Sequence, residues 1–445
     1  MSADLLIVNA RLVNENTETS ADVLIKDGRI VEIGPDLQGR EAKTVVDARG
    51  RHLLPGMIDD QVHFREPGLT QKGDMRTESR AAVAGGITSF MEMPNVKPAT
   101  LTLEALEDKY QRAAGRSAAN YAFYLGASNN NLDVIKSLNP RQACGVKVFM
   151  GASTGNLLVD RLDALEGIFA ESPILIATHC EDTPMIHANE KLAREKYGDD
   201  VPMWEHPNIR SAEACYASSS LAVSLAKKTG AKLHVLHLTT AKEMELFTCG
   251  DINHKQITAE ACVHHLWFNS DDYAALGAGI KCNPAVKTPL DQAAIVQAVK
   301  DDRIDVIATD HAPHTAEEKQ GSYFHSPAGL PLVQHAMLSL LDQVKRGIFD
   351  LPLIVRKTSH AVADRYQVAD RGYIREGYFA DLVLVDMEAS TTVRKDNLLY
   401  KCGWSPYEGV TFGASIDMTW VNGNLVWDGK HVTDSAFGQR LDFNR

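Results

Sequence analysis

The sequence has no long hydrophobic run and no cluster of basic residues. None of its apolar stretches approaches the ~18 residues that a membrane-spanning helix requires, so no membrane segment is predicted. Lys and Arg total 46 against 58 Asp and Glu, a formal net charge of −12. This balance disfavours nucleic acid and anionic membranes as partners. The start, Met1 to Asp4, has no basic region before an apolar one, so no signal peptide is expected.

Cysteine is also sparse. The seven cysteines are dispersed, odd in number and without a CxxC spacing. This pattern predicts reduced thiols in a cytoplasmic protein and argues against a structural Cys-zinc site. The remaining composition, with 44% hydrophobic and 23% charged residues, is that of a globular protein. It excludes disorder, collagen and coiled coil.

The two ends of the chain share one pattern of short β-type runs and tight turns. Asp27-Gly28 and Asn422-Gly423 are hairpin turn signals between such runs. Neither end is long enough to build a core alone. We therefore expect residues 1–52 and 376–445 to form one small β-sandwich domain together.

The middle of the chain, residues 53–375, alternates β-rich runs with helical stretches such as 102–115 and 212–229. Eight such alternations predict an α/β fold, a (β/α)8 TIM-like barrel with insertions. The predicted strands are Met57–Phe64, Ile87–Met93, Asn120–Ala127, Gly145–Met150, Ile174–Cys180, Leu233–Leu238, Gln256–Cys262 and Val306–Asp310.

Polar side chains stand at the carboxyl ends of these strands. The active site of a β/α barrel is built at that end from several strands, so these residues should meet. One His at a strand end is most often structural. Three His and one Asp there together predict a metal site for zinc or a similar divalent ion: His63, His179, His237 and Asp310.

Lys147 lies within a strand that the barrel covers on both faces, where an unpaired charge is costly. One interpretation is a lysine that reaches the barrel mouth and makes an ion pair. The other is a lysine that CO₂ converts to a carbamate able to bridge two metals. The residues alone leave both open. We expect His234 to be structural and His264 and His265 to be supporting residues.

Four motifs resemble those of the dihydroorotases, within the cyclic amidohydrolase superfamily. The motifs are Asp60–Gly68, Met93–Asn95, Gly145–Phe149 and Thr309–His314, and the likeness extends over nearly the whole chain. It implies reversible hydrolysis of (S)-dihydroorotate to N-carbamoyl-L-aspartate, a step of pyrimidine biosynthesis. It also implies a metal-bound hydroxide at the barrel mouth, one or two zinc ions and a small-molecule substrate. A homodimer is compatible with this prediction.

The resemblance also implies a role for each motif residue. His63, the carbamylated Lys147, His179, His237 and Asp310 would bind metal, and Asp310 would also move the proton. Arg65, Asn95 and His314 would bind the substrate carboxylate, with Asn283 and Pro327–Gly329 near the ring. The alternative for Arg65 is an ion pair with Glu66, and for Asn95 a turn.

The chain departs from the family pattern in its first motif. The family has His-x-His there, and this chain has Gln61 in place of the first His. An amide oxygen is a poorer zinc ligand than imidazole, so the more exposed metal is expected to be weaker, bound through Gln61, or absent. Lys287, where the family has Arg, is a minor departure.

Three rival functions follow from the same resemblance. Allantoinase shares the metal residues but typically has Asn where this chain has Arg65. Hydantoinase lacks the Arg-Glu-Pro-Gly signature of residues 65–68. A non-catalytic scaffold would fit the loss of a ligand at Gln61 but not the retention of the other metal residues.

Overall fold

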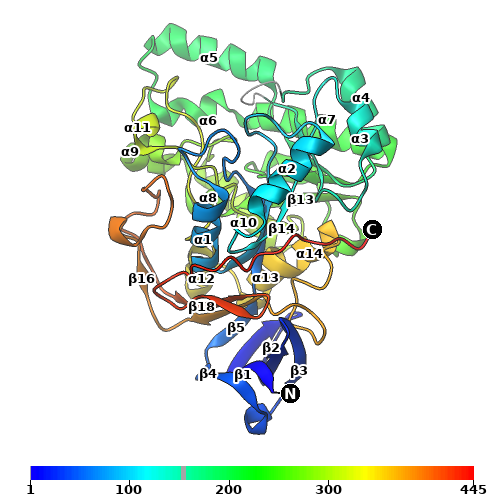
Figure 1. The fold of residues 1–445 in the computed structure, drawn as a ribbon. Coiled ribbons are helices and arrows are strands. Elements are labelled where there is room, and N and C mark those ends of the chain that lie inside the picture. The colour runs from blue at the N-terminus through cyan, green and yellow to red at the C-terminus, as the bar shows by residue number, and fades with distance from the viewer. Residues whose placement is uncertain (1, 152–156) are drawn as a thin grey trace.

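The structure, a computed structural model, describes residues 2–151 and 157–445. It consists of a β/α barrel with a smaller β domain at one end (Figure 1). The barrel strands confirm the eight predicted ones, each slightly shorter than expected: β6 (Met57–Val62), β7 (Ile87–Glu92), β8 (Asn120–Phe123) continued by β9 (Leu125–Gly126), β10 (Val146–Phe149), β11 (Ile176–His179), β12 (Leu233–Val235), β13 (Ile257–Cys262) and β14 (Val306–Ala308).

The barrel strands are parallel and close on themselves. β6, β7 and β8 form one sheet, and β9 to β14 form the next in chain order. A parallel bridge between Val62 and His311 joins the last strand region to the first. Nearly every strand residue is buried, as expected where helices cover the outside and side chains fill the inside.

Helices follow the strands and form the outer ring of the barrel (Figure 1). Side-chain caps start several of them; Asp74, for example, accepts a hydrogen bond from the Thr77 amide at 2.9 Å and begins α1. The helices are α1 (Met75–Ala84), α2 (Leu103–Ala113), α3 (Leu132–Ser137), α4 (Leu162–Glu171), α5 (Thr183–Tyr197), α6 (His206–Ile209), α7 (Ala212–Thr229), α8 (Val263–Trp267), α9 (Tyr273–Leu276), α10 (Pro289–Lys300), α11 (Ala316–Lys319), α12 (Ala336–Lys345), α13 (Leu351–Val355) and α14 (Ala361–Tyr366).

The two ends of the chain meet in one sheet, which confirms that they form one β domain. The decisive pairing is antiparallel, between β5 from the N-terminal part and β15 from the C-terminal part. The strands of this sheet are β1 (Ala3–Asn14), β2 (Thr17–Lys26), β3 (Arg29–Gly34), β4 (Ala42–Asp47), β5 (His52–Pro55), β15 (Leu382–Asp386), β18 (Ser415–Val421) and β19 (Asn424–Trp427).

The C-terminal part also reaches along the barrel. A two-stranded sheet of β16 (Thr391–Thr392) and β17 (Thr411–Phe412) packs beside α12, and the last residues bridge to the barrel at Tyr121. The predicted domain bounds at residues 52 and 375 stay predictions, and β5 spans the first of them.

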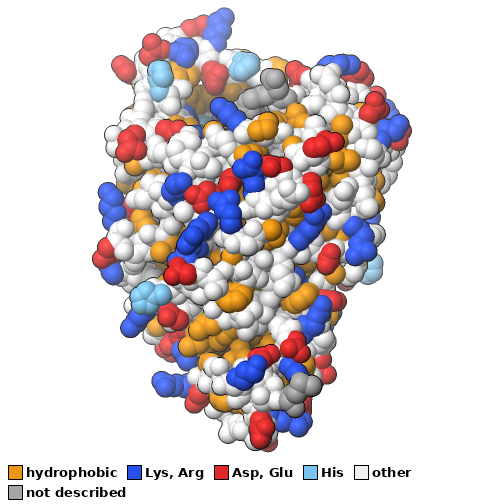
Figure 2. All heavy atoms as spheres, viewed as in Figure 1, with side chains coloured by type: hydrophobic (Ala, Val, Ile, Leu, Met, Phe, Trp, Pro, Cys, Tyr) orange, Lys and Arg blue, Asp and Glu red, His pale blue; other side chains and the backbone are white. Residues whose placement is uncertain are grey.

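No helix among residues 2–151 and 157–445 is long and apolar enough to cross a membrane. On the face drawn in Figure 2, basic and acidic side chains are interspersed, with apolar side chains in small groups between them. The local charges inside a pocket therefore matter more for binding than the net charge of the chain.

Candidate active site at the mouth of the barrel

All nine predicted site residues line one pocket of about 290 Å³. Most of them come from the ends of barrel strands, as the strand-end rule predicts, and Asn283 comes from the segment between α9 and α10. Three of them have positive backbone φ angles, namely Arg65 (70°), His237 (39°) and Asp310 (52°). Such a conformation is strained for residues other than glycine and clusters at functional sites. The wall also includes Gln61, Phe149, Arg210, Ala312 and Pro327–Gly329.

His179 and His237 form the first group of donors in the pocket. Their Nδ1 and Nε2 atoms lie 3.0 Å apart. Two nitrogen ligands at about 2.0–2.1 Å from one zinc ion can span such a separation. Burial holds the pKa of His237 well below its ordinary value, so this imidazole stays neutral and keeps a lone pair. These donors therefore fit a divalent ion.

Glu181 and Arg210 fix the orientation of His179. The Nε2–H of His179 donates to Glu181 Oε2 at 2.7 Å, which leaves Nδ1 to face the pocket. Arg210 donates to the same carboxylate oxygen at 2.7 Å. Burial opposes the charge of Glu181, but Arg210 and His179 outweigh it and hold its pKa at about 2. Neither Glu181 nor Arg210 was predicted from the sequence, although Glu181 follows His179 by two residues.

Lys147 projects from β10 into this interior and is fully buried. Its Nζ has no hydrogen-bond partner among the described residues and lies 4.7 Å from the ring centre of Phe149. Burial lowers its pKa to about 8. No described carboxylate lies within ion-pair distance of Nζ, so the ion-pair interpretation of Lys147 finds no support.

His63, Asn95 and Asp310 form the second group of donors. His63 Nδ1 lies 2.7 Å from Asn95 Oδ1 and its Nε2 lies 3.1 Å from Asp310 Oδ1, so each ring nitrogen faces one oxygen. Gln61 Nε2 donates to the same Asp310 oxygen at 3.2 Å. The side chain of Asn95 thus holds His63, which is more than a turn residue does.

Arg65 and His314 form a basic wall opposite these donors. Arg65 Nε donates to the Pro313 carbonyl at 3.0 Å, and its Nη2 lies 3.1 Å from His314 Nε2. Burial lowers the pKa of Arg65 to about 10, still far above neutrality. The expected alternative, an ion pair with Glu66, is wrong because Glu66 binds Arg116 at 2.6 Å instead.

Lys72 reinforces this wall and was not anticipated from the sequence. Its Nζ donates to His314 Nδ1 at 3.0 Å and pairs with Glu318 at 3.1 Å. Burial, followed by Arg65 and Lys72, keeps the pKa of His314 well below its ordinary value. The chain must also approach closely here, since a Cβ on Gly329, whose φ is 143°, would lie 2.9 Å from His314. The wall therefore carries two cations around a neutral imidazole.

Two further groups of buried metal-capable side chains occur among the described residues. Asp60, His234 and Glu260, here called the interior triad, lie inside the barrel. His234 Nε2 is 3.3 Å from Asp60 and 3.5 Å from Glu260, and these carboxylates raise the pKa of His234 to about 9 despite its burial. A protonated His234 is thus the counter-ion of two carboxylates, which agrees with its predicted structural role.

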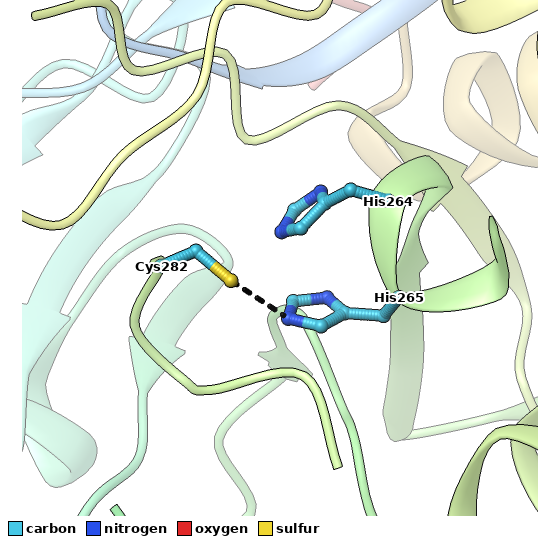
Figure 3. Close-up of side chains that lie close together, drawn as sticks. All are labelled: His264, His265 and Cys282. Carbon is cyan, nitrogen blue, oxygen red and sulfur yellow. Dashed lines mark hydrogen bonds between the residues drawn. The ribbon is translucent and has the colours of Figure 1, made fainter. Parts of the chain in front are cut away.

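The second group is His264, His265 and Cys282 (Figure 3). The two rings lie 3.9 Å apart between centres, and Cys282 faces His265. His265 Nε2 and Cys282 Sγ both donate to the Pro284 carbonyl, at 2.9 and 3.2 Å. These bonds hold the segment that presents Asn283 to the pocket, which agrees with the predicted supporting role of the two histidines.

Comparison with known proteins gives the family. The model of the "Amidohydrolase family" matches residues 52–426. The chain belongs to this family. The amidohydrolase is 33% identical to a dihydroorotase of Halobacterium salinarum, over 94% of this chain and 98% of the relative. It is 30% identical to an allantoinase of Salmonella choleraesuis, over 97% and 96%.

The solved structures agree on the fold. The L-hydantoinase (dihydropyrimidinase) from Arthrobacter aurescens superposes with a TM-score of 0.93 at 26% identity, covering 99% of this chain and 100% of that one. The predicted barrel with its split β domain is therefore confirmed. The family identifies a metal-dependent amidohydrolase. The relatives named above carry different enzyme names at similar sequence identity, so the substrate has to be inferred from the pocket.

Proposed function

We propose that this amidohydrolase is a dihydroorotase, which interconverts (S)-dihydroorotate and N-carbamoyl-L-aspartate in pyrimidine biosynthesis. The observation that carries the proposal is Arg65, a buried guanidinium beside the donors of the pocket. It has no ion-pair partner among the described residues. Arg is the residue best suited to a planar carboxylate, because it offers two parallel donors. A substrate that combines a cyclic amide with a carboxylate uses both sides of this pocket.

The candidate metal ligands are His63, Lys147, His179, His237 and Asp310, with zinc as the expected ion. A bound divalent ion supplies a nucleophile, because it lowers the pKa of its water from 15.7 toward about 7. The fit rests on the converging imidazoles of His179 and His237. Glu181 keeps the His179 lone pair aimed at that point.

Lys147 joins this set as a carbamate. A neutral amine is needed to attack CO₂, and the burial that lowers the pKa of Lys147 to about 8 supplies one near neutrality. Nζ forms a bond to the CO₂ carbon and loses one proton, so a carboxylate replaces a cation. The unpartnered, buried Nζ supports this proposal over an ion pair.

Asp310 moves the proton. Its Oδ1 is held by Gln61 and His63, and its Oδ2 makes no hydrogen bond with the described residues. Oδ2 takes the proton of the attacking water, whose oxygen bonds to the ring carbonyl carbon, and returns it to the ring nitrogen as the C–N bond breaks. The same carboxylate acts in reverse during ring closure.

The substrate carboxylate binds Arg65, with His314 and the amide Nδ2 of Asn95 as further partners. Asn283 lines the pocket nearby and contacts the ring in this proposal. The proposal also includes a cytoplasmic location, as the dispersed thiols predict, and leaves a homodimer open.

Allantoinase is the second candidate, because one relative at 30% identity carries that name. Allantoin lacks a carboxylate, so Arg65 would face no anion. The test is a side-by-side assay of the purified protein with dihydroorotate, allantoin and dihydrouracil. Turnover of dihydroorotate with a kcat/KM at least tenfold above the others supports the proposal, and faster turnover of either rival substrate refutes it. No turnover of any of the three, by zinc-loaded protein, favours the scaffold.

A further inference from the structure

The two groups of donors in the pocket are unequal, and the difference lies at Gln61. His179 and His237 offer two imidazole nitrogens to one point. On the opposite side, His63 and Asp310 offer one nitrogen and one oxygen, and the third side chain is the amide of Gln61. Whether this side can bind an ion depends on which atom the amide presents.

The hydrogen bonds of Gln61 fix the direction of its amide. Its Nε2 faces Asp310 Oδ1 at 3.2 Å, and its Oε1 faces Cys262 Sγ at 3.7 Å. The Cys262 thiol also faces Glu260 Oε1 at 3.5 Å, so the contact with Asp310 is the one that sets the amide direction. The opposite orientation would set the amide oxygen against a carboxylate oxygen. Gln61 therefore presents N–H, which has no lone pair for a metal.

This N–H points at the oxygen that an ion on the His63 side would need. Asp310 Oδ1 is 3.1 Å from His63 Nε2 and already accepts from Gln61. A cation placed between His63 and Asp310 would meet the amide hydrogens of Gln61 and would be repelled. The Gln61 amide instead donates a hydrogen bond to the Asp310 oxygen that a second ion would otherwise coordinate.

We infer that the pocket retains one divalent ion per chain, at His179 and His237, and that Gln61 excludes a second ion from the His63 side. This inference removes His63 from the candidate zinc ligands. It rests on the proposed function for the choice of zinc as the ion. It assigns His63 to positioning: the ring is held by Asn95 and contacts the same Asp310 oxygen as Gln61.

The test counts ions without substrate. The full-length protein is loaded with excess zinc, passed through a desalting column, and measured for zinc per chain by mass spectrometry. We expect one ion in the wild type, one in His63→Asn and two in Gln61→His. His179→Asn should lose the retained ion. Gln61→Met, of similar size but without an amide, is the matched control for repacking and should keep one.

An ion bound by His264, His265 and Cys282 would add to the zinc count, so each variant is also measured with Cys282→Ser. Cobalt gives a separate readout, since a thiolate-to-cobalt absorption band would reveal an ion on Cys282 and not on the imidazoles of the pocket. If the zinc count falls by one in Cys282→Ser, that ion is assigned to the cluster and subtracted from the count for the pocket.

Several outcomes overturn the inference. Two pocket ions in the wild type, or none, contradict it. So does a retained ion that is lost in His63→Asn and kept in His179→Asn. If Gln61→His folds, as its circular dichroism would show, and still holds one ion, Gln61 is not what excludes the second. The counts are independent of the substrate, so one ion without dihydroorotate turnover refutes the proposed function alone, and two ions with turnover refute this inference alone.

Discussion

The pocket and the interior triad contain the same kinds of side chain, histidines and carboxylates from barrel strands, and differ in how their charges are matched. In the triad a protonated His234 lies between Asp60 and Glu260, and Tyr366 donates to Asp60 at 2.7 Å. In the pocket, the imidazoles of His179 and His237 face one another, and Lys147 Nζ has no partner among the described residues. Matched charges indicate a structural role, and unmatched donors indicate a place for ligands.

One atom pair joins the two regions. The backbone N–H of His237 donates to Glu260 Oε1 at 3.0 Å, while the other oxygen of Glu260 faces His234. The triad therefore supports the strained φ of His237, 39°, from below. A change in the triad should act on stability first, and a change in the pocket on turnover first.

The largest expected effect separates the two regions at Asp310. Asp310→Asn removes the proton acceptor and keeps the size of the side chain, so kcat for dihydroorotate should fall by about 10²–10⁴-fold. The unfolding midpoint in denaturant should stay close to that of the wild type. Activity within threefold of the wild type would contradict the proton-transfer role of Asp310.

The reverse pattern is expected for the triad. His234→Gln leaves two buried carboxylates without their counter-ion, and breaking a buried pair costs about 3–5 kcal/mol. Equilibrium unfolding in urea measures this loss. His187→Gln, a change of an exposed histidine, is the control and should leave the free energy of unfolding unchanged. Equal stability of the two variants would show that the triad is not an ion cluster.

The fold and most of the pocket could be predicted from the sequence, because both follow from where polar residues stand relative to strands. His63, His179, His237 and Asp310 were placed by the strand-end rule alone, and the structure brings them into one pocket. Arg65 and Asn95 also follow predicted strands, and the motif resemblance gave them their substrate role and added Asn283 and His314.

The sequence could not predict the contacts that loops and helices make around this pocket. Glu181 and Lys72 contact pocket histidines at 2.7 and 3.0 Å, and Arg210 donates to Glu181 at 2.7 Å. A charged residue in a loop has no sequence pattern that reveals its partner. Gln61 was recognised as a departure, but the direction of its amide depends on Asp310, far away in the sequence. Tertiary contacts decide such details.

A rise in pH should lower the free energy of unfolding through the interior triad. The carboxylates of Asp60 and Glu260 raise the pKa of His234 to about 9 despite its burial. His234 holds a proton in the folded chain that the unfolded chain releases at lower pH, so stability is present near pH 6 and falls as pH rises to 9. Urea unfolding at pH 6 and 9 should show this loss, and His234→Gln should show less of it. An equal pH dependence in both proteins would exclude the charged form of His234.

The next effect concerns substrate binding at Arg65. Arg65→Lys keeps the charge and loses the planar pair of donors, so kcat/KM for dihydroorotate should fall by about 10–100-fold, in line with the strength of a charge-assisted hydrogen bond. The zinc count should not change, because Arg65 is not among the ligands. An unchanged kcat/KM would mean that the substrate carboxylate binds elsewhere.

The smallest effect tests Lys72, which reaches the pocket only through His314. Its Nζ donates to His314 Nδ1 at 3.0 Å, so the proton of this ring is on Nε2, 3.0 Å from the Ala328 carbonyl. This Nε2–H is the donor that the proposed function directs at the substrate carboxylate. Lys72→Met removes the donor and one positive charge, so KM for dihydroorotate should rise about 5–10-fold, one hydrogen bond at about 1–1.5 kcal/mol, with kcat little changed. Lys72→Arg should restore most of the affinity. A fall in kcat at unchanged KM would instead show that Lys72 acts on proton transfer by Asp310. The pocket would then not divide into a wall that binds substrate and a side that reacts.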